Sequence, residues 1–272
     1  LNNVLEWSDK YDKDLHGLLT SDISYTKQIL GIERDNATKI RKDFAKYKDI
    51  LPNTFYMYDN LFEESIKEAH EGILRDLGPT DILVNGAGGN HPRAQTENEY
   101  FHNEDLGQMK TFFDLDQKGI DFVFSLNYMG TLLPTKEFAK DMVNRKGCSI
   151  LNISSMNSFT PLTKIPAYSG AKAAVSNFTK WLAVHFSKVG IRCNAIAPGF
   201  FVTKQNEKLL YNDDGTPTAR TEKILRNTPM DRFGEAEELV GATLFLCSHE
   251  AASFVTGICV PIDGGFSSYS GV

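Results

Sequence analysis

The sequence has no long hydrophobic run, few cysteines and no excess of positive charge. None of its apolar segments approaches the roughly 18 to 20 residues that a membrane-spanning helix needs, and the N-terminus lacks the basic-then-apolar pattern of a signal peptide. The cysteines occur singly, without a C-x-x-C pattern or a histidine at ligand spacing. We therefore expect a soluble cytoplasmic protein with no disulfide framework, no metal site and these buried thiols: Cys148, Cys193, Cys247 and Cys259.

The charge balance argues against a nucleic-acid partner. The net charge is -6 and the pI is near 5.6. The densest basic run, KIRKDFAKYK at 39–48, also contains Asp43 and has the pattern of one solvated side of a helix. Because 41% of the residues are hydrophobic and 11% aromatic, the composition is that of a packed globular protein.

From residue 59 onward, short apolar runs alternate with amphipathic stretches. This alternation is typical of a parallel sheet with crossover helices, so the sequence predicts a three-layer, doubly wound α/β fold. The predicted helices cover 59–78, 121–145, 167–188 and 235–248, and the predicted strands cover 81–85, 148–154, 191–197 and 257–263. Two polar segments, 90–120 and 203–232, are long for loops and are expected to be lids or binding segments.

Tyr168 and Lys172 stand four residues apart at the start of a predicted helix. Positions four apart lie on the same side of a helix, so this pair alone is explained more simply as ordinary neighbours. Ser155 precedes Tyr168 by thirteen residues and stands at the C-terminal end of the strand 148–154. Ligands of open parallel sheets gather at that edge, so Ser155 and Tyr168 are predicted to meet there.

Two further features point to the same edge. Asn127 lies in an apolar segment, where its amide must find partners or lose roughly 1 to 3 kcal/mol. Pro198 and Gly199 follow a strand end with a backbone suited to passing over a flat ligand. Each feature has a structural alternative: Ser155 as a cap, Asn127 as a satisfied core group, and the Pro-Gly pair as a plain turn.

Taken together, these segments resemble the short-chain dehydrogenase/reductase family over about residues 59–272. Within the family, the insertion at 90–120 and the stretches around Ser155 and Pro198 look most like the fructuronate reductase (D-mannonate oxidoreductase) branch. The matching motifs are NGAG (85–88), LNYMG (126–130), NISS (152–155), YSGAK (168–172), APGFFVT (197–203) and DGG (263–265).

The resemblance implies a nicotinamide-dependent exchange between a ketone and a secondary alcohol on a sugar acid. A phenol with a pKa near 10 exchanges protons poorly at neutral pH, and a nearby ammonium lowers that pKa. Tyr168 would thus be the acid and base, tuned by Lys172, which could also hold the nicotinamide ribose. Ser155 would bond the substrate oxygen, and Asn127 would anchor a water connecting Lys172 to solvent.

The resemblance also implies NAD or NADP as cofactor and a homo-oligomer, either a dimer or a tetramer. Basic loop residues and an amide near Ser155 could meet the sugar acid: Arg93, Asn157, Lys164 and Lys204. The implied cofactor-binding residues are Asp59, Asn85, Gly86, Ala87, Gly88, Tyr168, Lys172, Pro198, Gly199, Val202 and Thr203.

Residues 1–58 depart from the family pattern and are interpreted as a separate, mostly helical segment before a reductase domain at 59–272. The family begins with a strand and a glycine-rich turn that binds pyrophosphate, but Gly17 and Gly31 are the only glycines before Gly72. The only plausible strand expected there is 53–59. Without the first strand, residues 81–85 would carry an unpaired edge.

Residues 5–64 look somewhat like part of a glutamyl-tRNA synthetase, which would make the chain a chimera joined near residue 60. The alternative function is then a fusion or truncated reductase with intact catalytic residues but no competent cofactor site. A further alternative is a 3-oxoacyl-acyl-carrier-protein reductase. The choice between NAD and NADP stays open, because the selecting residue follows the second strand of the family, which was not found.

Overall fold

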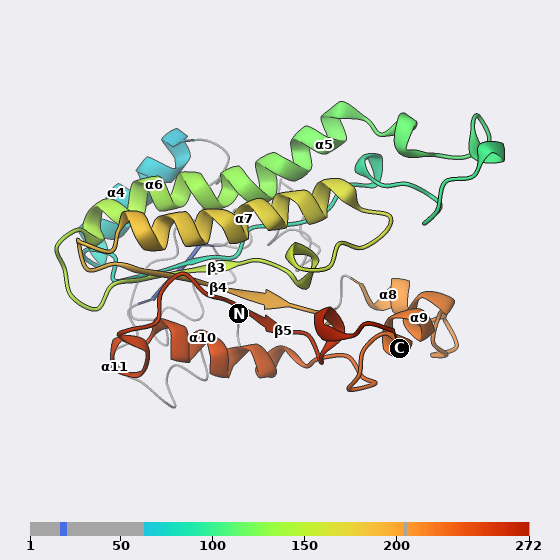
Figure 1. Ribbon diagram of the computed structural model, residues 1–272. Coiled ribbons are helices and arrows are strands. Elements are labelled where there is room, and N and C mark those ends of the chain that lie inside the picture. Colours follow the sequence, from blue (N-terminus) through green and yellow to red (C-terminus); the bar gives the residue numbers. More distant parts are fainter. Residues whose placement is uncertain (1–16, 21–62, 204–205, 272) are drawn as a thin grey trace.

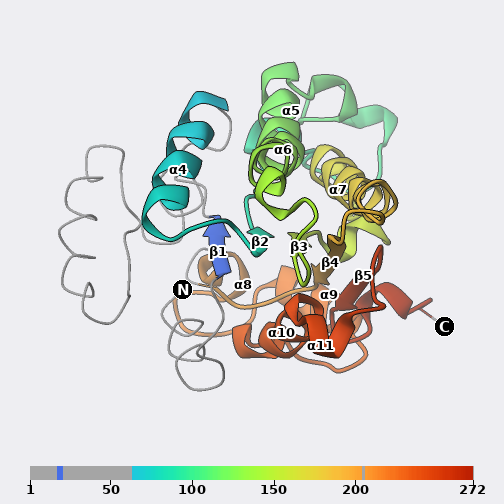
Figure 2. The same cartoon turned by 90° about the vertical axis from the view of Figure 1, so that its left-hand side faces the viewer.

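The computed structural model describes residues 17–20, 63–203 and 206–271. Its strands form one parallel sheet in the order β1-β2-β3-β4-β5. Helices α4, α6 and α7 cover one face, and α10 and α11 cover the other (Figures 1 and 2). The predicted doubly wound α/β fold is confirmed. The strands are β1 Gly17–Thr20, β2 Ile82–Asn85, β3 Ser149–Ile153, β4 Arg192–Pro198 and β5 Cys259–Ile262.

The expectation that β2 has an unpaired edge is wrong. Strand β1 pairs with β2 in parallel, from Gly17 opposite Ile82 to Thr20 opposite Asn85. The apolar part of this strand is two leucines after a charged stretch, too short for a period of two to stand out from the sequence. The strand expected at 53–59 lies outside the described residues, as does the segment that follows β1.

The predicted helices and later strands are present with shifted ends. The pattern at 121–145 is broken into α5, a π-helical turn η5 at Ser125–Met129, and α6. The predicted helix at 59–78 is described from Glu63 onward. The helices are α4 Glu63–Asp76, α5 Gln117–Phe124, α6 Gly130–Met142, α7 Pro166–His185, α8 Glu207–Leu210, α9 Ala219–Arg226, α10 Val240–Cys247 and α11 His249–Ala252.

Apolar side chains fill both spaces between the sheet and its helices. Ile73, Phe138 and Leu182 come from α4, α6 and α7 and are buried in one cluster. Leu246 of α10 packs with Leu151 on the opposite face. The thiols Cys148, Cys193 and Cys247 are buried as expected, and Cys259 is half-buried. Burial raises the pKa of Cys193 to about 12 and that of Cys247 to about 11. No helix in the described ranges has the length and apolar character to cross a membrane.

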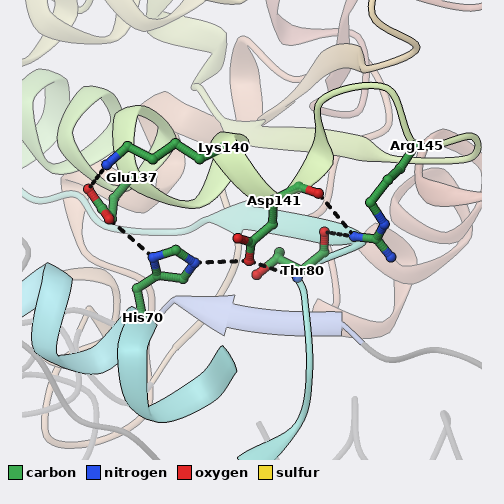
Figure 3. A network of polar contacts seen from close by, with 6 residues as sticks. All are labelled: His70, Thr80, Glu137, Lys140, Asp141 and Arg145. Atoms are coloured by element: carbon green, nitrogen blue, oxygen red, sulfur yellow. Dashed lines mark hydrogen bonds and ion pairs between the residues drawn. The ribbon is translucent and has the colours of Figure 1, made fainter. Parts of the chain in front are cut away.

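A network of charged groups joins α4 to the last turns of α6 (Figure 3). His70 of α4 is buried, with Nδ1 3.1 Å from Glu137 Oε1 and Nε2 2.9 Å from Asp141 Oδ2. Lys140 Nζ donates to Glu137 Oε2 at 2.6 Å, and the backbone N–H of Thr80 donates to Asp141 at 3.1 Å. The network fixes the start of β2 to the end of α6.

Candidate active site

Lys172 is a buried cation on α7. Its side chain is almost wholly removed from solvent, and Nζ donates to the backbone oxygen of Ile153 at 2.8 Å. Burial lowers its pKa to about 8, because removal from water disfavours the charged form. Nζ lies 5.9 Å from the centroid of the Tyr168 ring, one helical turn earlier. The structure therefore places the predicted ammonium beside the predicted phenol.

Asn127 lies in the π-helical turn η5 and is fully buried. Its Nδ2 donates to the backbone oxygens of Gly89 and Val123, each at 2.7 Å, and its Oδ1 accepts from Gly89 N at 3.2 Å. The predicted need of this amide for partners is met. These bonds hold the segment after β2 against η5.

Lys172 and Asn127 both lie close to Gly88. A Cβ at Gly88 would lie 2.7 Å from Lys172 Nζ and 2.8 Å from Asn127 Oδ1, closer than real Cβ contacts. Both polar groups therefore reach the same point, just beyond β2. A side chain at residue 88 would displace at least one of them.

Ser155 lies two residues beyond the end of β3 and caps the short helix η6 (Met156–Ser158). Its Oγ accepts a hydrogen bond from Asn157 N at 3.3 Å. Accepting this bond leaves the hydroxyl proton for another acceptor, so the capping role and the catalytic role are compatible. Since η6 packs on α7, Ser155 and Tyr168 lie on contacting elements. That their hydroxyls meet at a substrate oxygen stays a prediction.

Pro198 ends β4, and Gly199 packs closely against the DGG turn. A Cβ at Gly199 would lie 2.6 Å from the Cα of Asp263, so a side chain there would push against backbone. Val202 and Thr203 follow on the exposed side. This close contact is with the protein's own Asp263, and the predicted approach of Pro198 and Gly199 to a flat ligand stays a prediction.

The residues expected to meet a sugar acid differ in how they are engaged. Arg93 donates to Asp116 at 2.7 Å, so its charge is already paired. Lys164 is half-buried, and its backbone oxygen accepts from Thr96 N at 3.0 Å. Asn157 is buried, and its Oδ1 has no hydrogen-bond partner in the part of the chain that is described. Asp59 and Lys204 lie outside the described residues.

The two long polar segments lie at the carboxyl edge of the sheet. The arrowheads of β4 and β5 point toward the end where the 90–116 extension and helices α8 and α9 lie (Figure 1). An ion pair between Glu99 of the extension and Lys223 of α9 joins the two segments. This position is the one that substrate-binding loops of doubly wound folds occupy.

Two site groups were missed from the sequence. Gly89 bonds Asn127 through both its backbone N–H and its oxygen, and Ile153 supplies the carbonyl that holds Lys172. Both act through backbone atoms. The only sequence signal for Gly89 was the pair of glycines that follows Gly86 and Ala87. The residue type of Ile153 gives no indication of the role of its carbonyl.

The chain is similar in sequence to known oxidoreductases. A family model described as enoyl-(acyl carrier protein) reductase matches residues 29–267. An uncharacterized oxidoreductase of Haemophilus influenzae is 56% identical over 266 residues, covering 95% of this chain and 91% of the relative. The chain belongs to the short-chain dehydrogenase/reductase family.

Solved structures agree with this membership. A candidate D-mannonate oxidoreductase from Haemophilus influenzae with bound NAD has a TM-score of 0.80 at 57% identity, covering 88% of this chain and 85% of that chain. A gluconate 5-dehydrogenase from Burkholderia cenocepacia in complex with NADP and tartrate has a TM-score of 0.67 at 25% identity, covering 87% of this chain and 83% of that chain.

The resemblance of residues 5–64 to a glutamyl-tRNA synthetase is not borne out. Because 95% of the chain aligns with one oxidoreductase, most of the first 58 residues also align with it. The family model likewise begins at residue 29. A low-glycine, charged segment was mistaken for a foreign one because the expected glycine-rich turn was absent from it.

Proposed function

We propose that this reductase-family chain interconverts a keto group and a secondary alcohol on a sugar acid of the fructuronate or mannonate type, using NAD or NADP. The observation that carries the proposal is the buried Lys172 ammonium, placed beside Tyr168 and sharing one point with Asn127 at Gly88. The substrate class is supported by the similarity to the candidate D-mannonate oxidoreductase.

The residues at the carboxyl edge fit the nicotinamide end of such a cofactor. Gly88 and Gly199 let the segments after β2 and β4 pack closely on Lys172 and Asp263 at this edge, and Lys172 offers N–H groups beyond the one that bonds Ile153. When bound, the nicotinamide supplies or accepts the hydride. Residues that would hold the pyrophosphate are expected after β1, outside the described residues.

In the reductive direction, Tyr168 donates its proton to the substrate oxygen. The neighbouring Lys172 ammonium favours the phenolate and so eases that transfer. Ser155 donates a hydrogen bond to the same oxygen as negative charge develops on it. Asn127 keeps the segment after β2 in place, and its role in anchoring a water for proton return to Lys172 is part of the proposal.

Spectrophotometric assays with NADH and NADPH test the proposal. The panel contains fructuronate, 5-keto-gluconate and an acetoacetyl thioester, with Tyr168→Phe as the inactive control. Fastest turnover of a keto sugar acid supports the proposal, whereas fastest turnover of the thioester favours the acyl-carrier-protein reductase alternative. Absence of NADH and NADPH binding at submillimolar concentration in calorimetry would favour the alternative without a competent cofactor site.

We also infer a cytoplasmic homo-oligomer, and a division of the chain near residue 58 that the single sheet crosses, because β1 precedes residue 58 and pairs with β2 after it. Light scattering after size-exclusion chromatography tests the first inference through the particle mass. Limited proteolysis tests the second, because cleavage should concentrate near residue 58 if the boundary exists.

A further inference from the structure

Four buried, uncharged polar side chains form a continuous chain of hydrogen bonds between the sheet and its two central helices, and a fifth residue, Thr131, joins it through its backbone oxygen. None is more than 2% exposed. Asn85 Nδ2 donates to Thr135 Oγ1 at 2.9 Å and to Asn152 Oδ1 at 2.8 Å. Asn152 Nδ2 donates to Thr179 Oγ1 at 2.9 Å. We call this set the cross-brace; its members are Asn85, Thr131, Thr135, Asn152 and Thr179.

The direction of every hydrogen bond in the cross-brace is fixed. The Thr135 hydroxyl donates to Thr131 O at 2.8 Å, so it must accept from Asn85. The Thr179 hydroxyl donates to Val175 O at 2.9 Å, so it must accept from Asn152. Because each hydroxyl proton is used, a member that turned would leave a further buried polar group unpaired, in addition to Asn85 Oδ1, which has no partner among the described residues.

The cross-brace ties α6 to α7 through the sheet. Asn85 and Asn152 are register partners on β2 and β3, and each reaches a different helix. Thr135 follows Asn127 by eight residues, or about 12 Å at 1.5 Å per residue, and Thr179 follows Lys172 by seven, or about 10 Å. The brace therefore lies at a similar depth below both members of the catalytic set.

One member also touches the catalytic set directly. Thr131 Oγ1 donates to the backbone oxygen of Asn127 at 2.9 Å, inside the break between α5 and α6. This bond fixes the turn whose side chain holds Gly89. The brace thus continues without interruption from α7, through two strands, to the π-helical turn that carries Asn127.

We propose that the cross-brace sets the position of Asn127 relative to Lys172 and Tyr168, and that Thr135 and Thr179 are positioning residues for the reaction. The inference rests on the proposed function for the roles of Tyr168 and Lys172. A cross-brace that served stability alone would also be buried and hydrogen-bonded, so the test separates geometry from stability.

The test compares Thr135→Val and Thr179→Val, which keep the side-chain shape and remove the hydroxyl, with Thr135→Ser and Thr179→Ser, which retain it. Thr243→Val is the control, since the hydroxyl of the half-buried Thr243, on α10 across the sheet, also donates to a carbonyl four residues back, that of Leu239. We expect kcat to fall about tenfold in the valine variants, because small displacements of catalytic groups are costly. KM should change less than about twofold, and the pH midpoint of kcat should shift. Serine should restore both, and Thr243→Val should change neither.

A readout that needs no substrate accompanies the kinetics. Titration of the Lys172 amine is followed by NMR in each variant, with Lys172→Met identifying its signal. A displaced Lys172 midpoint in Thr179→Val, but not in Thr243→Val, supports the inference even if the enzyme reduces a compound other than a sugar acid. Valine variants that melt earlier but keep the wild-type kcat, pH profile and Lys172 titration would overturn it.

Discussion

The two ends of helix α6 take part in polar networks of opposite character. Near its start, Thr131 and Thr135 belong to the uncharged cross-brace below the catalytic residues. Near its end, Glu137 and Asp141 bind His70 in the charged corner of Figure 3. The first network keeps its hydrogen bonds over the whole pH range in which its members stay uncharged. The second contains ionisable carboxyl groups, and although burial raises the pKa of Glu137, hydrogen bonds and charges from Lys140 and His70 hold that pKa below its ordinary value.

We infer that the network near the start of α6 serves catalysis and that the network near its end serves stability. Substitutions at the carboxyl edge of the sheet should change turnover with little effect on folding. Substitutions at the charged corner should change folding with little effect on turnover, because the corner lies beyond the brace from Lys172. Four variants test whether catalysis and stability depend on these separate networks. They are ordered from the largest expected effect to the smallest.

Lys172→Met should produce the largest effect and act on catalysis alone. We expect kcat/KM to fall about 1,000-fold, equivalent to about 4 kcal/mol, through loss of the ammonium beside Tyr168. Since burial holds the pKa of Lys172 down to about 8, removing the charge should leave the melting temperature unchanged or higher. Lys180→Met on the exposed side of α7 is the control, and a large drop in melting temperature would contradict the separation.

His70→Leu should act on stability alone. It leaves Glu137 and Asp141, whose side chains are 13% and 10% exposed, without the imidazole that contacts both. Breaking such a buried pair should lower the free energy of unfolding by about 3 kcal/mol, measured by urea titration at pH 7. The kcat of the folded variant should match wild type. His249→Leu, at an exposed position, is the control, and a tenfold loss of kcat in His70→Leu would break the comparison.

Gly88→Ala should displace Lys172 or Asn127 and so lower activity. The added Cβ would lie within 2.8 Å of both Lys172 Nζ and Asn127 Oδ1, and neither is free to move without losing a hydrogen bond. We expect kcat/KM to fall about 30-fold, equivalent to about 2 kcal/mol. Gly241→Ala, where a Cβ would meet nothing within 4 Å, is the control. Wild-type kinetics in Gly88→Ala would show that the site relaxes around the methyl group.

The sequence allowed prediction of those features that depend on periodicity or on residue type. The alternation after residue 59 predicted β2 to β5 and their helices, and the motifs around Tyr168 predicted Lys172 and Asn127 as neighbours. Strand β1 was missed because four residues give too little pattern. The roles of Gly89 and Ile153 were missed because backbone groups have no identity in a sequence. The cross-brace joins residues up to 67 positions apart, which no local pattern reveals.

Glu137→Gln should give the smallest effect and show it as a pH dependence. Burial raises the pKa of the Glu137 carboxyl, but hydrogen bonds and charges from Lys140 and His70 outweigh it and hold the pKa below its ordinary value of 4.5. A carboxyl with a depressed pKa stabilises the fold above its unfolded pKa and loses that contribution as the pH falls through its folded value. Glu137→Gln should therefore be less stable than wild type by about 1 kcal/mol at pH 7. The difference should shrink below about pH 4.5, measured by urea unfolding at each pH. Glu68→Gln on the exposed side of α4 is the control. A difference that stays constant from pH 7 to pH 3 would mean that the packing of the amide, rather than the charge of Glu137, explains the loss, and the charged corner would then resemble the cross-brace.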